Sequence, residues 1–378
     1  MLQLRIFNTH SRKIENFAPL HPNKIKMYVC GVTPYDTSHL GHAFVFIFFD
    51  VVKRFFTHIG YKVTYVQNVT NIDDPLIERA KELHTTWEKL ADKWIRYLLH
   101  DFKFLNIAMP DFFIYATDEL EMMKKIITTL IEKKHAYIQE GNIYFSVDTF
   151  SHYGELSKLS RKEMLVLSAE RGNDIKDPNK KNPLDFLLWK KSKKGEPSWS
   201  SPWNNGRPGW HIECTAMSMK YLGKQIDIHG GGNDLIFPHH ESETAQAESY
   251  SGVSPFVKTW MHCGMVSCGG EKMSKSLGNL VYVQDLAKDH SPNTIRHYLL
   301  RHHYRKDWNH SEKGLQDSAQ KMHSIEIAVR GIHTVSELHT HSIDLFSDDF
   351  DIPSVLEEMY RTKDVVEKKL LFDVLGFC

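Results

Sequence analysis

Three side chains that could act on an anion or a metal lie close together near the N-terminus of the chain. Cys30 ends an alternating run from Ile25 that predicts a buried strand, and an apolar run with helical spacing covers residues 41–55. His39 and His42 stand at the start of that predicted helix. A helix start presents unpaired backbone N–H groups and partial positive charge, which favour a phosphate. Two imidazoles three residues apart can face one anion, although the pattern is also typical of an ordinary helix start with two solvated histidines.

Two later strands are predicted to end in polar or glycine-rich segments. The run from Tyr61 to Val69 alternates, is rich in β-branched residues and leads directly into Thr70. A strand, a helix and a strand at this spacing predict a parallel βαβ unit, whose ligands bind at the carboxyl ends of the strands. The predicted strand from Gln225 to His229 is followed by glycines and an aspartate, which would let a nucleotide approach the backbone. These residues are Gly230, Gly231, Gly232 and Asp234.

Two further segments carry side chains that could bind a ligand or take part in a reaction. His239 and Glu243 are four residues apart at the start of a predicted helix and therefore share one face. The glycine-bounded loop of residues 270–278 contains Lys272, Lys275 and two hydroxyl side chains. From about Tyr282 onward the pattern is mostly helical.

Composition limits the classes of protein to consider. The chain has 378 residues, enough for two or three domains, and its 47 basic residues balance 47 acidic ones. The 5 cysteines are scattered, which argues for a reducing compartment rather than a disulfide scaffold and leaves metal ligation open. We see no secretory signal and no apolar run long enough to span a membrane. The sequence therefore predicts a soluble cytoplasmic protein.

Motifs in a fixed order identify a family that the chain resembles. They are Tyr28-Val29-Cys30-Gly31, His39-Leu40-Gly41-His42, Gly209-Trp210-His211-Ile212-Glu213-Cys214, Asp227-Ile228-His229-Gly230-Gly231-Gly232, Phe237-Pro238-His239-His240-Glu241 and Lys272-Met273-Ser274-Lys275-Ser276. With these motifs at these separations, the chain resembles the cysteinyl-tRNA synthetases, a family of class I aminoacyl-tRNA synthetases, as far as about Asp307. The resemblance implies a ligase that joins cysteine to tRNA(Cys).

The resemblance also implies the fold class and domain order. We expect an α/β protein with a Rossmann-like parallel-sheet catalytic domain, a connective insertion and a helical C-terminal region. The expected ranges are 1–125 for the first catalytic half, 126–203 for the insertion, 204–262 for the second half, 263–335 for the KMSKS loop and the helices that contact the tRNA stem, and 336–378 for a short, truncated or reduced C-terminal region. The lysine-rich, polar segment 151–203 predicts irregular structure.

Members of the family bind one zinc ion, and the matching residues here are Cys30, Cys214, His239 and Glu243. Sulfur, imidazole and carboxylate ligands suit Zn²⁺. Zinc coordination of a thiolate separates cysteine from serine, whereas pocket shape alone would contribute only ~1–3 kcal/mol. We expect Cys263 and Cys268 to be buried thiols, with a second metal site as the alternative.

The family's substrate contacts can be transferred in the same way. Thr70 and Trp210 match residues beside the bound amino acid, although a core aromatic is an equally good interpretation of Trp210. The catalytic residues implied are His39, His42, Lys272 and Lys275, which act on the phosphates of ATP. ATP with Mg²⁺ would contact His39, Gly41, His42, Gly230, Gly231, Gly232, Asp234 and Lys275. The expected partners are ATP, L-cysteine and tRNA(Cys), and the protein is expected to be a monomer.

Two features depart from the family pattern. Phe44 and Val45 stand where the family commonly has Arg-Thr, and the region after Asp351 is shorter than the family's anticodon-binding region. Two other functions therefore remain alternatives. One is a cysteine ligase for an amino-sugar acceptor, of the mycothiol type, and the other is a non-catalytic paralogue. Retention of both histidines and both lysines favours the synthetase over the paralogue.

Overall fold

A five-stranded parallel sheet forms the centre of the molecule. The computed structural model describes residues 3–36, 38–273, 277–333 and 337–378. The strand order is β12 (Val257–Cys263), β11 (Ile226–Gly232), β3 (Lys24–Val32), β4 (Lys62–Val69) and β5 (Phe112–Tyr115), and all neighbouring pairs are parallel. The predicted strands at residues 25–30, 61–69 and 225–229 correspond to β3, β4 and β11, so the predicted parallel sheet is confirmed.

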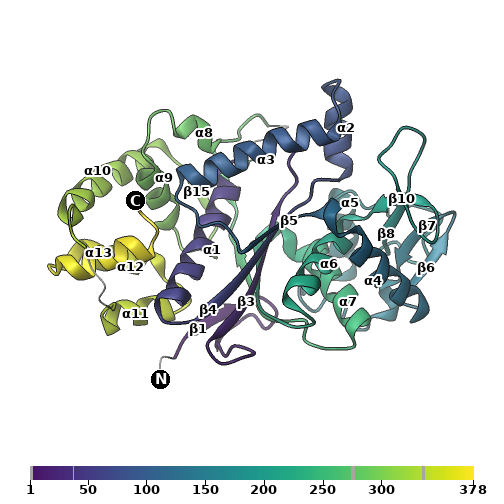
Figure 1. Cartoon of the computed structure of the whole chain (residues 1–378), viewed down its shortest axis with the longest axis horizontal. Helices are drawn as coiled ribbons and strands as arrows, with labels where there is room; N and C mark the ends of the chain where they lie inside the picture. The colour runs from purple at the N-terminus through teal and green to yellow at the C-terminus, as the bar shows by residue number, and fades with distance from the viewer. Residues whose placement is uncertain (1–2, 37, 274–276, 334–336) are drawn as a thin grey trace.

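Helices cover both faces of this sheet (Figure 1). On one face α1 (Leu40–His58) packs against β4 and β11 and is itself covered by α9 (Pro292–Leu300). On the other face α6 (Trp210–Leu222) packs against β3 and β4. The helices α4 (Leu120–Glu132) and α7 (Glu241–Ser251) lie against α6. Each face therefore has its own apolar core, and the sheet lies between the two cores.

The insertion is more regular than the sequence predicted. It forms an antiparallel sheet in the order β6 (Ala136–Gln139), β7 (Asn142–Phe145), β8 (Phe186–Lys191), β10 (Asn205–Pro208) and β9 (Trp199–Ser200), and it also contains α5 (Arg161–Glu170). The prediction of irregular structure over 151–203 holds for much of that range but was wrong at α5, β8 and β9. The strand β8 is hard to recognise in the sequence because it ends in two lysines and more lysines follow. This sheet also runs past the expected boundary at 203, as far as Pro208.

The segment after the central sheet is mostly helical and lies at the opposite end of the molecule from the insertion (Figure 1). A small sheet of β14 (Glu271–Lys272), β13 (Val266–Cys268) and β15 (Trp308–His310) leads into it. Its helices are α8 (Val283–Leu286), α9, α10 (Glu312–Val329), α11 (Thr340–Ser347), α12 (Ile352–Arg361) and α13 (Val365–Val374).

The remaining elements lie around the central domain. They are the hairpin of β1 (Arg5–Asn8) and β2 (Lys13–Asn16), the helices α2 (Asp74–Glu82) and α3 (Trp87–Phe104), and the short turns η1 (Ala116–Glu119), η2 (Val147–Thr149), η3 (Asn233–Leu235) and η4 (Ile236–His240). The first strand predicted from the sequence begins at Ile25, whereas in the structure the hairpin of β1 and β2 comes before it. No helix among the described residues has both the length and the apolar character that a membrane crossing requires.

Candidate active site

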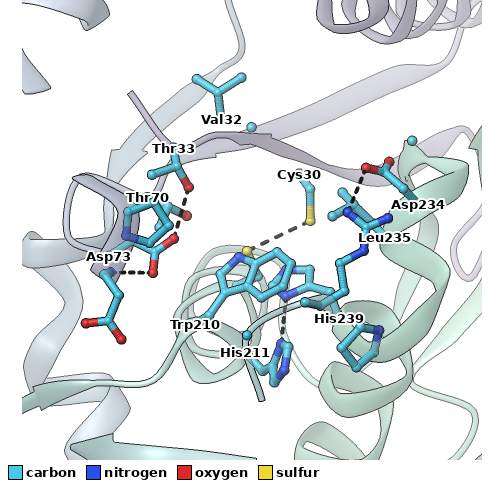
Figure 2. Close-up of a pocket in the computed structure, with 18 of the residues that line it drawn as sticks. Cys30, Val32, Thr33, Thr70, Asp73, Trp210, His211, Asp234, Leu235 and His239 are labelled. Carbon is cyan, nitrogen blue, oxygen red and sulfur yellow. Dashed lines mark hydrogen bonds and ion pairs between the residues drawn. The ribbon is translucent and has the colours of Figure 1, made fainter. Parts of the chain in front are cut away.

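A cavity of about 820 Å³ opens at the carboxyl ends of β3, β4 and β11. Figure 2 shows Cys30, Trp210 and His239 grouped in this pocket, with Thr70 and Asp73 to one side of them and Asp234 to the other. Many of the residues singled out from the sequence line the cavity. These are Cys30, His39, Gly41, His42, Thr70, Trp210, Cys214, Gly232, Asp234, His239 and Lys272. The parallel sheet thus gathers motifs that are far apart in the sequence.

Four of the lining and underlying side chains form a buried donor cluster. The candidate ligand atoms of Cys30, Cys214, His239 and Glu243 all lie within 4.8 Å of one another. The two Sγ atoms are 3.9 Å apart (Figure 2), and Oε1 of Glu243 is 3.7 Å from Sγ of Cys30 and 3.1 Å from Nε2 of His239. Three different segments supply them, because β3 carries Cys30 near its end, α6 carries Cys214, and the consecutive elements η4 and α7 carry the other two.

The orientation of His239 is fixed by its neighbours. Its Nδ1 lies 2.9 Å from Nδ1 of His211, so Nε2 is the nitrogen that faces the cluster. The indole of Trp210 stacks on the His239 ring with centroids 4.4 Å apart. This side of the pocket therefore has an aromatic wall in direct contact with a candidate metal ligand.

A second group of donors shares two members with the first. Cys30, His229, His240 and Glu243 also have ligand atoms within 4.8 Å of one another. Oε2 of Glu243 lies 3.0 Å from Nε2 of His229, whereas Nε2 of His240 lies 3.3 Å from Sγ of Cys30. The sequence motifs contain His211, His229 and His240, but the sequence does not indicate them as site residues. Which histidine of a motif contacts the donor cluster depends on the geometry of the fold.

Burial controls the protonation of this cluster. It raises the pKa of the Cys30 thiol and of the Glu243 carboxyl well above their ordinary values, and it lowers the pKa of His239 and His240 well below theirs. Without a cation, burial therefore favours the neutral form of each of these groups. A divalent cation would supply the positive charge that a buried thiolate and carboxylate need. With two sulfurs, an imidazole and a carboxylate oxygen in reach of one point, the donor set fits zinc.

The two signature histidines lie at the N-terminus of α1. Their rings stack with centroids 3.8 Å apart, and the backbone N–H of Gly41 donates to Nδ1 of His39 over 3.1 Å. Nδ1 of His42 is buried without a hydrogen-bond partner among the described residues, and burial lowers the pKa of His42. This helix start therefore combines backbone N–H groups with an imidazole that has bonding capacity left for a ligand.

The segment that follows the glycine-bounded loop of residues 270–278 pairs with the start of α1. The N–H of Leu40 donates to the carbonyl of Val281, and the N–H of Val283 donates to the carbonyl of Ser38. At the base of the loop, Nδ2 of Asn279 donates to the Lys272 carbonyl over 3.2 Å. Lys272 is exposed on β14 and lines the cavity, whereas Lys275 lies outside the described residues. Backbone hydrogen bonds thus join the first signature motif to the residues that follow the second one.

The glycines after β11 have different surroundings. Gly232 and Asp234 line the cavity, but Gly230 and Gly231 are not among its described lining residues. A Cβ atom on Gly230 would lie 2.0 Å from Cζ of Phe49, so this glycine permits α1 to pack on the sheet. All three glycines belong to β11 itself, which is longer than the predicted strand.

Two acidic residues that follow β4 line the cavity at the start of α2, which Asp73 caps. Oδ1 of Asp73 accepts from the N–H of Asp74 over 2.7 Å at the start of α2. Burial raises the pKa of Asp73 to about 6. Asp74 pairs with Lys190, 2.9 Å away, and with Arg207, so strands β8 and β10 of the insertion reach the cavity here.

The other two cysteines of interest lie elsewhere. Cys263 is a buried free thiol at the end of β12, and Cys268 is a half-buried free thiol on β13. Neither belongs to a donor group found among the described residues.

Comparisons with known proteins match most of the chain to one family. A family model described as tRNA synthetases class I (C) catalytic domain matches residues 16–320. The chain is 42% identical to a cysteine–tRNA ligase of Haemophilus influenzae over 98% of this chain and 81% of that protein. It is 47% identical to a cysteine–tRNA ligase of Baumannia cicadellinicola over 86% of this chain and 70% of that protein.

Solved structures show the same fold in more distant proteins. A Mycobacterium tuberculosis methionyl-tRNA synthetase in complex with methionyl-adenylate superposes with a TM-score of 0.65 at 16% identity. The superposition covers 93% of this chain and 84% of that one. The central sheet, the insertion and the helical segment are therefore arranged as in proteins of this architecture.

Proposed function

From the family to which the chain belongs, the cysteine–tRNA ligases of class I, we infer that it activates L-cysteine with ATP and transfers it to tRNA(Cys). The observation that carries this function is the cluster of Cys30, Cys214, His239 and Glu243, because it lies beside the helix start that carries both signature histidines in one cavity. One end of the cavity suits a thiol, and the other suits a phosphate.

We propose that these four side chains hold one zinc ion. When bound, zinc would stabilise the substrate's sulfur as a thiolate, which a serine hydroxyl cannot match. The chain's own residues position the rest of the amino acid. Trp210 packs over His239, and Oγ1 of Thr70, held by the Asn68 amide 3.2 Å away, lies in the adjoining wall.

In the first step, the cysteine carboxylate attacks the α-phosphorus of ATP and pyrophosphate leaves. Negative charge spreads over the phosphoryl oxygens, so N–H donors and cations around them lower the barrier. We assign this role to His39, His42 and the start of α1, together with Lys272 and Lys275 of the loop. Gly232 and Asp234 would lie on the adenosine side of the cavity. Gly230 and Gly231 precede them in β11 and would contribute only backbone to this side. Mg²⁺ would accompany the triphosphate.

In the second step, the 2′-hydroxyl of the tRNA's 3′-terminal adenosine attacks the carbonyl carbon of the cysteinyl-adenylate, and AMP leaves. The acceptor end would enter the cavity, which residues of both catalytic halves and of the insertion line. We propose the expected division into catalytic halves at 1–125 and 204–262, with the start of the second half moved beyond Pro208, where the insertion's sheet ends. We also propose that the protein works as a monomer in the cytoplasm.

The test combines metal analysis with ATP–pyrophosphate exchange. Purified protein should contain about one zinc per chain, and exchange should depend on cysteine and be negligible with serine. The Cys214→Ser variant should lose zinc and exchange together. Zinc-replete protein without cysteine-dependent exchange would support the non-catalytic paralogue. Labelled cysteine appearing on glucosaminyl-inositol, and not on tRNA, would support the amino-sugar ligase instead.

A further inference from the structure

The C-terminal end of helix α5 forms part of the wall of the active-site cavity. Ser168, Glu170, Arg171, Gly172 and Asn173 line it, although they belong to the insertion and carry none of the motifs described above. The helix packs against η4, the turn that holds His239. The insertion therefore reaches the nucleotide and amino-acid pocket directly at this point.

Arg171 connects this wall to the end of β11. Its Nη1 lies 3.5 Å from Oδ2 of Asp234, the ion pair drawn at Asp234 in Figure 2. The side chains are 29% and 32% exposed, so both ions face the open cavity rather than a dry core. Asp234 follows Gly232, where a Cβ atom would lie 2.6 Å from Oδ1 of the aspartate. The carboxylate is thus packed closely against the backbone on the proposed adenosine side.

A fixed turn presents the Arg171 side chain. The N–H of Arg171 donates to the Leu167 carbonyl over 3.1 Å, and Gly172 then turns the chain with φ +86°. Asn173 closes the turn, because its N–H donates to the Ser168 carbonyl over 3.0 Å and its Nδ2 to the Ser168 hydroxyl over 2.7 Å. The backbone that carries the guanidinium is therefore held in place before any ligand binds.

The charges around Arg171 indicate what its loss would do. Glu170 and Asp234 are carboxylates on the same wall, whereas the expected ligand is a triphosphate. Of the other cationic side chains described in the lining, Lys190 and Arg207 are paired with Asp74, and Lys272 lies on the signature loop. Among the described lining residues, Arg171 is therefore the cation paired with Asp234, the carboxylate packed beside Gly232. Without it, the charge of Asp234 would repel the nucleotide.

We propose that Arg171 is a positioning residue for ATP. By pairing with Asp234 it fixes that carboxylate and holds the end of α5 against the nucleotide side of the cavity, so ATP binding and docking of the insertion are coupled. This inference rests on the proposed function, because it takes the cavity to be the ATP site.

The test uses Arg171→Gln with Arg161→Gln as the matched control. Arg161 is the first residue of the same helix and pairs with Asp148 within the insertion, 3.9 Å away, outside the cavity lining. In cysteine-dependent exchange, Arg171→Gln should raise KM for ATP about 3- to 10-fold, with kcat and KM for cysteine within about 2-fold. Arg171→Lys should recover part of the loss, and Arg161→Gln should match the unsubstituted protein. An unchanged KM for ATP in Arg171→Gln, or an equal change in Arg161→Gln, would overturn the proposal.

A second measurement separates this inference from the proposed function. ATP should slow amide hydrogen exchange over residues 161–173 in the unsubstituted protein and in Arg161→Gln, but not in Arg171→Gln. One outcome would reject the ligase function and retain the role of Arg171. In it, no protein catalyses cysteine-dependent ATP–pyrophosphate exchange, but ATP still protects residues 161–173 in the unsubstituted protein and in Arg161→Gln, and not in Arg171→Gln. Equal protection in all three proteins would reject the role of Arg171 while leaving the ligase function standing.

Discussion

Glu243 bonds to two different histidines through its two oxygens. Oε1 faces Nε2 of His239 at 3.1 Å, and Oε2 faces Nε2 of His229 at 3.0 Å. Beyond them, His240 contacts His262 through its Nδ1 at 2.7 Å. An outer layer of imidazoles therefore surrounds the four candidate ligands, and such outer partners orient the ligands and tune their basicity.

His211 is the outer residue whose effect is easiest to isolate. We expect His211→Phe to weaken zinc binding about 10- to 100-fold, because His239 loses the partner that directs Nε2 toward the cluster. Competition with a chromogenic chelator measures the change. The exposed His152, which pairs with Glu155 in the insertion, provides the control variant His152→Phe. Equal zinc affinity in the two variants would contradict the orienting role.

Asp73 gives a prediction for pH dependence. Its pKa is about 6 in the folded protein against an ordinary value of 3.8, so the folded state binds more protons than the unfolded state between these pH values. The stability contributed by the protonated carboxyl is complete below pH 3.8 and is lost as the pH rises through about 6.

Asp73→Asn should therefore stabilise the protein at neutral pH. Asparagine caps a helix as well as aspartate does, and it removes the cost of a buried charge. We expect its free energy of unfolding at pH 7.5 to exceed that of the unsubstituted protein by roughly 1–3 kcal/mol. The difference should shrink to roughly a third near pH 4.5 and approach zero only below pH 3.8. Urea unfolding of both proteins at pH 7.5 and 4.5 measures this difference in the free energy of unfolding. An equal difference at both pH values would argue against a raised pKa of Asp73.

At the scale of elements, the insertion and α7 are joined through one buried side chain. Glu241, the first residue of α7, accepts from the N–H of Ser157 over 2.8 Å and from the N–H of Leu156 over 3.4 Å. A few residues away, the hydroxyl of Tyr153 lies 3.2 Å from that of Ser242. The helix that carries Glu243 is thus connected to the insertion at its first turn.

Glu241→Ala should loosen this connection. Two buried N–H groups lose their acceptor, so the free energy of unfolding should fall by about 1–3 kcal/mol. Proteolysis should also become faster within residues 151–160. Glu241→Gln is the matched control, because its amide oxygen can still accept a hydrogen bond. If Glu241→Ala and Glu241→Gln are equally stable and equally resistant to protease, the carboxylate does not hold the two elements together.

At the scale of the whole molecule, Arg296 connects three parts of the chain. It pairs with Asp50 of α1 in a fully buried ion pair. Its Nε donates to the Leu375 carbonyl and its Nη1 to the Leu105 carbonyl, each over 2.9 Å. The catalytic sheet's first helix, the segment after α3 and the last helix therefore meet at one guanidinium.

Arg296→Met should weaken the whole fold rather than the active site. It leaves the two buried carbonyls without their donor and leaves Asp50 with Arg54 as its remaining cationic partner. The free energy of unfolding should therefore fall by about 2–5 kcal/mol. Urea unfolding measures the loss, and zinc content should be unchanged at temperatures where the protein stays folded. Arg79→Met, which breaks an exposed pair with Glu82, should change stability by less than about 1 kcal/mol. Equal stability of the two variants would contradict the connecting role.

The sequence by itself determined the parallel βαβ core, and through its motifs the family and the residues that meet in the site. Alternation and helical spacing revealed β3, α1 and β4 because those patterns record which face of each element is buried. The family's motif matches selected Cys30, Cys214, His239 and Glu243, whose ligand atoms the fold brings within 4.8 Å.

Only the tertiary structure decided which neighbours complete the site. The strand β8 of the insertion is obscured by its lysines, and Arg171 and Glu241 carry no local signal of their contacts with Asp234 and the loop at Ser157. Each of these contacts joins residues more than 60 positions apart in the chain. Local patterns record burial and backbone preference, whereas the pairing of polar side chains across elements depends on how those elements pack against one another.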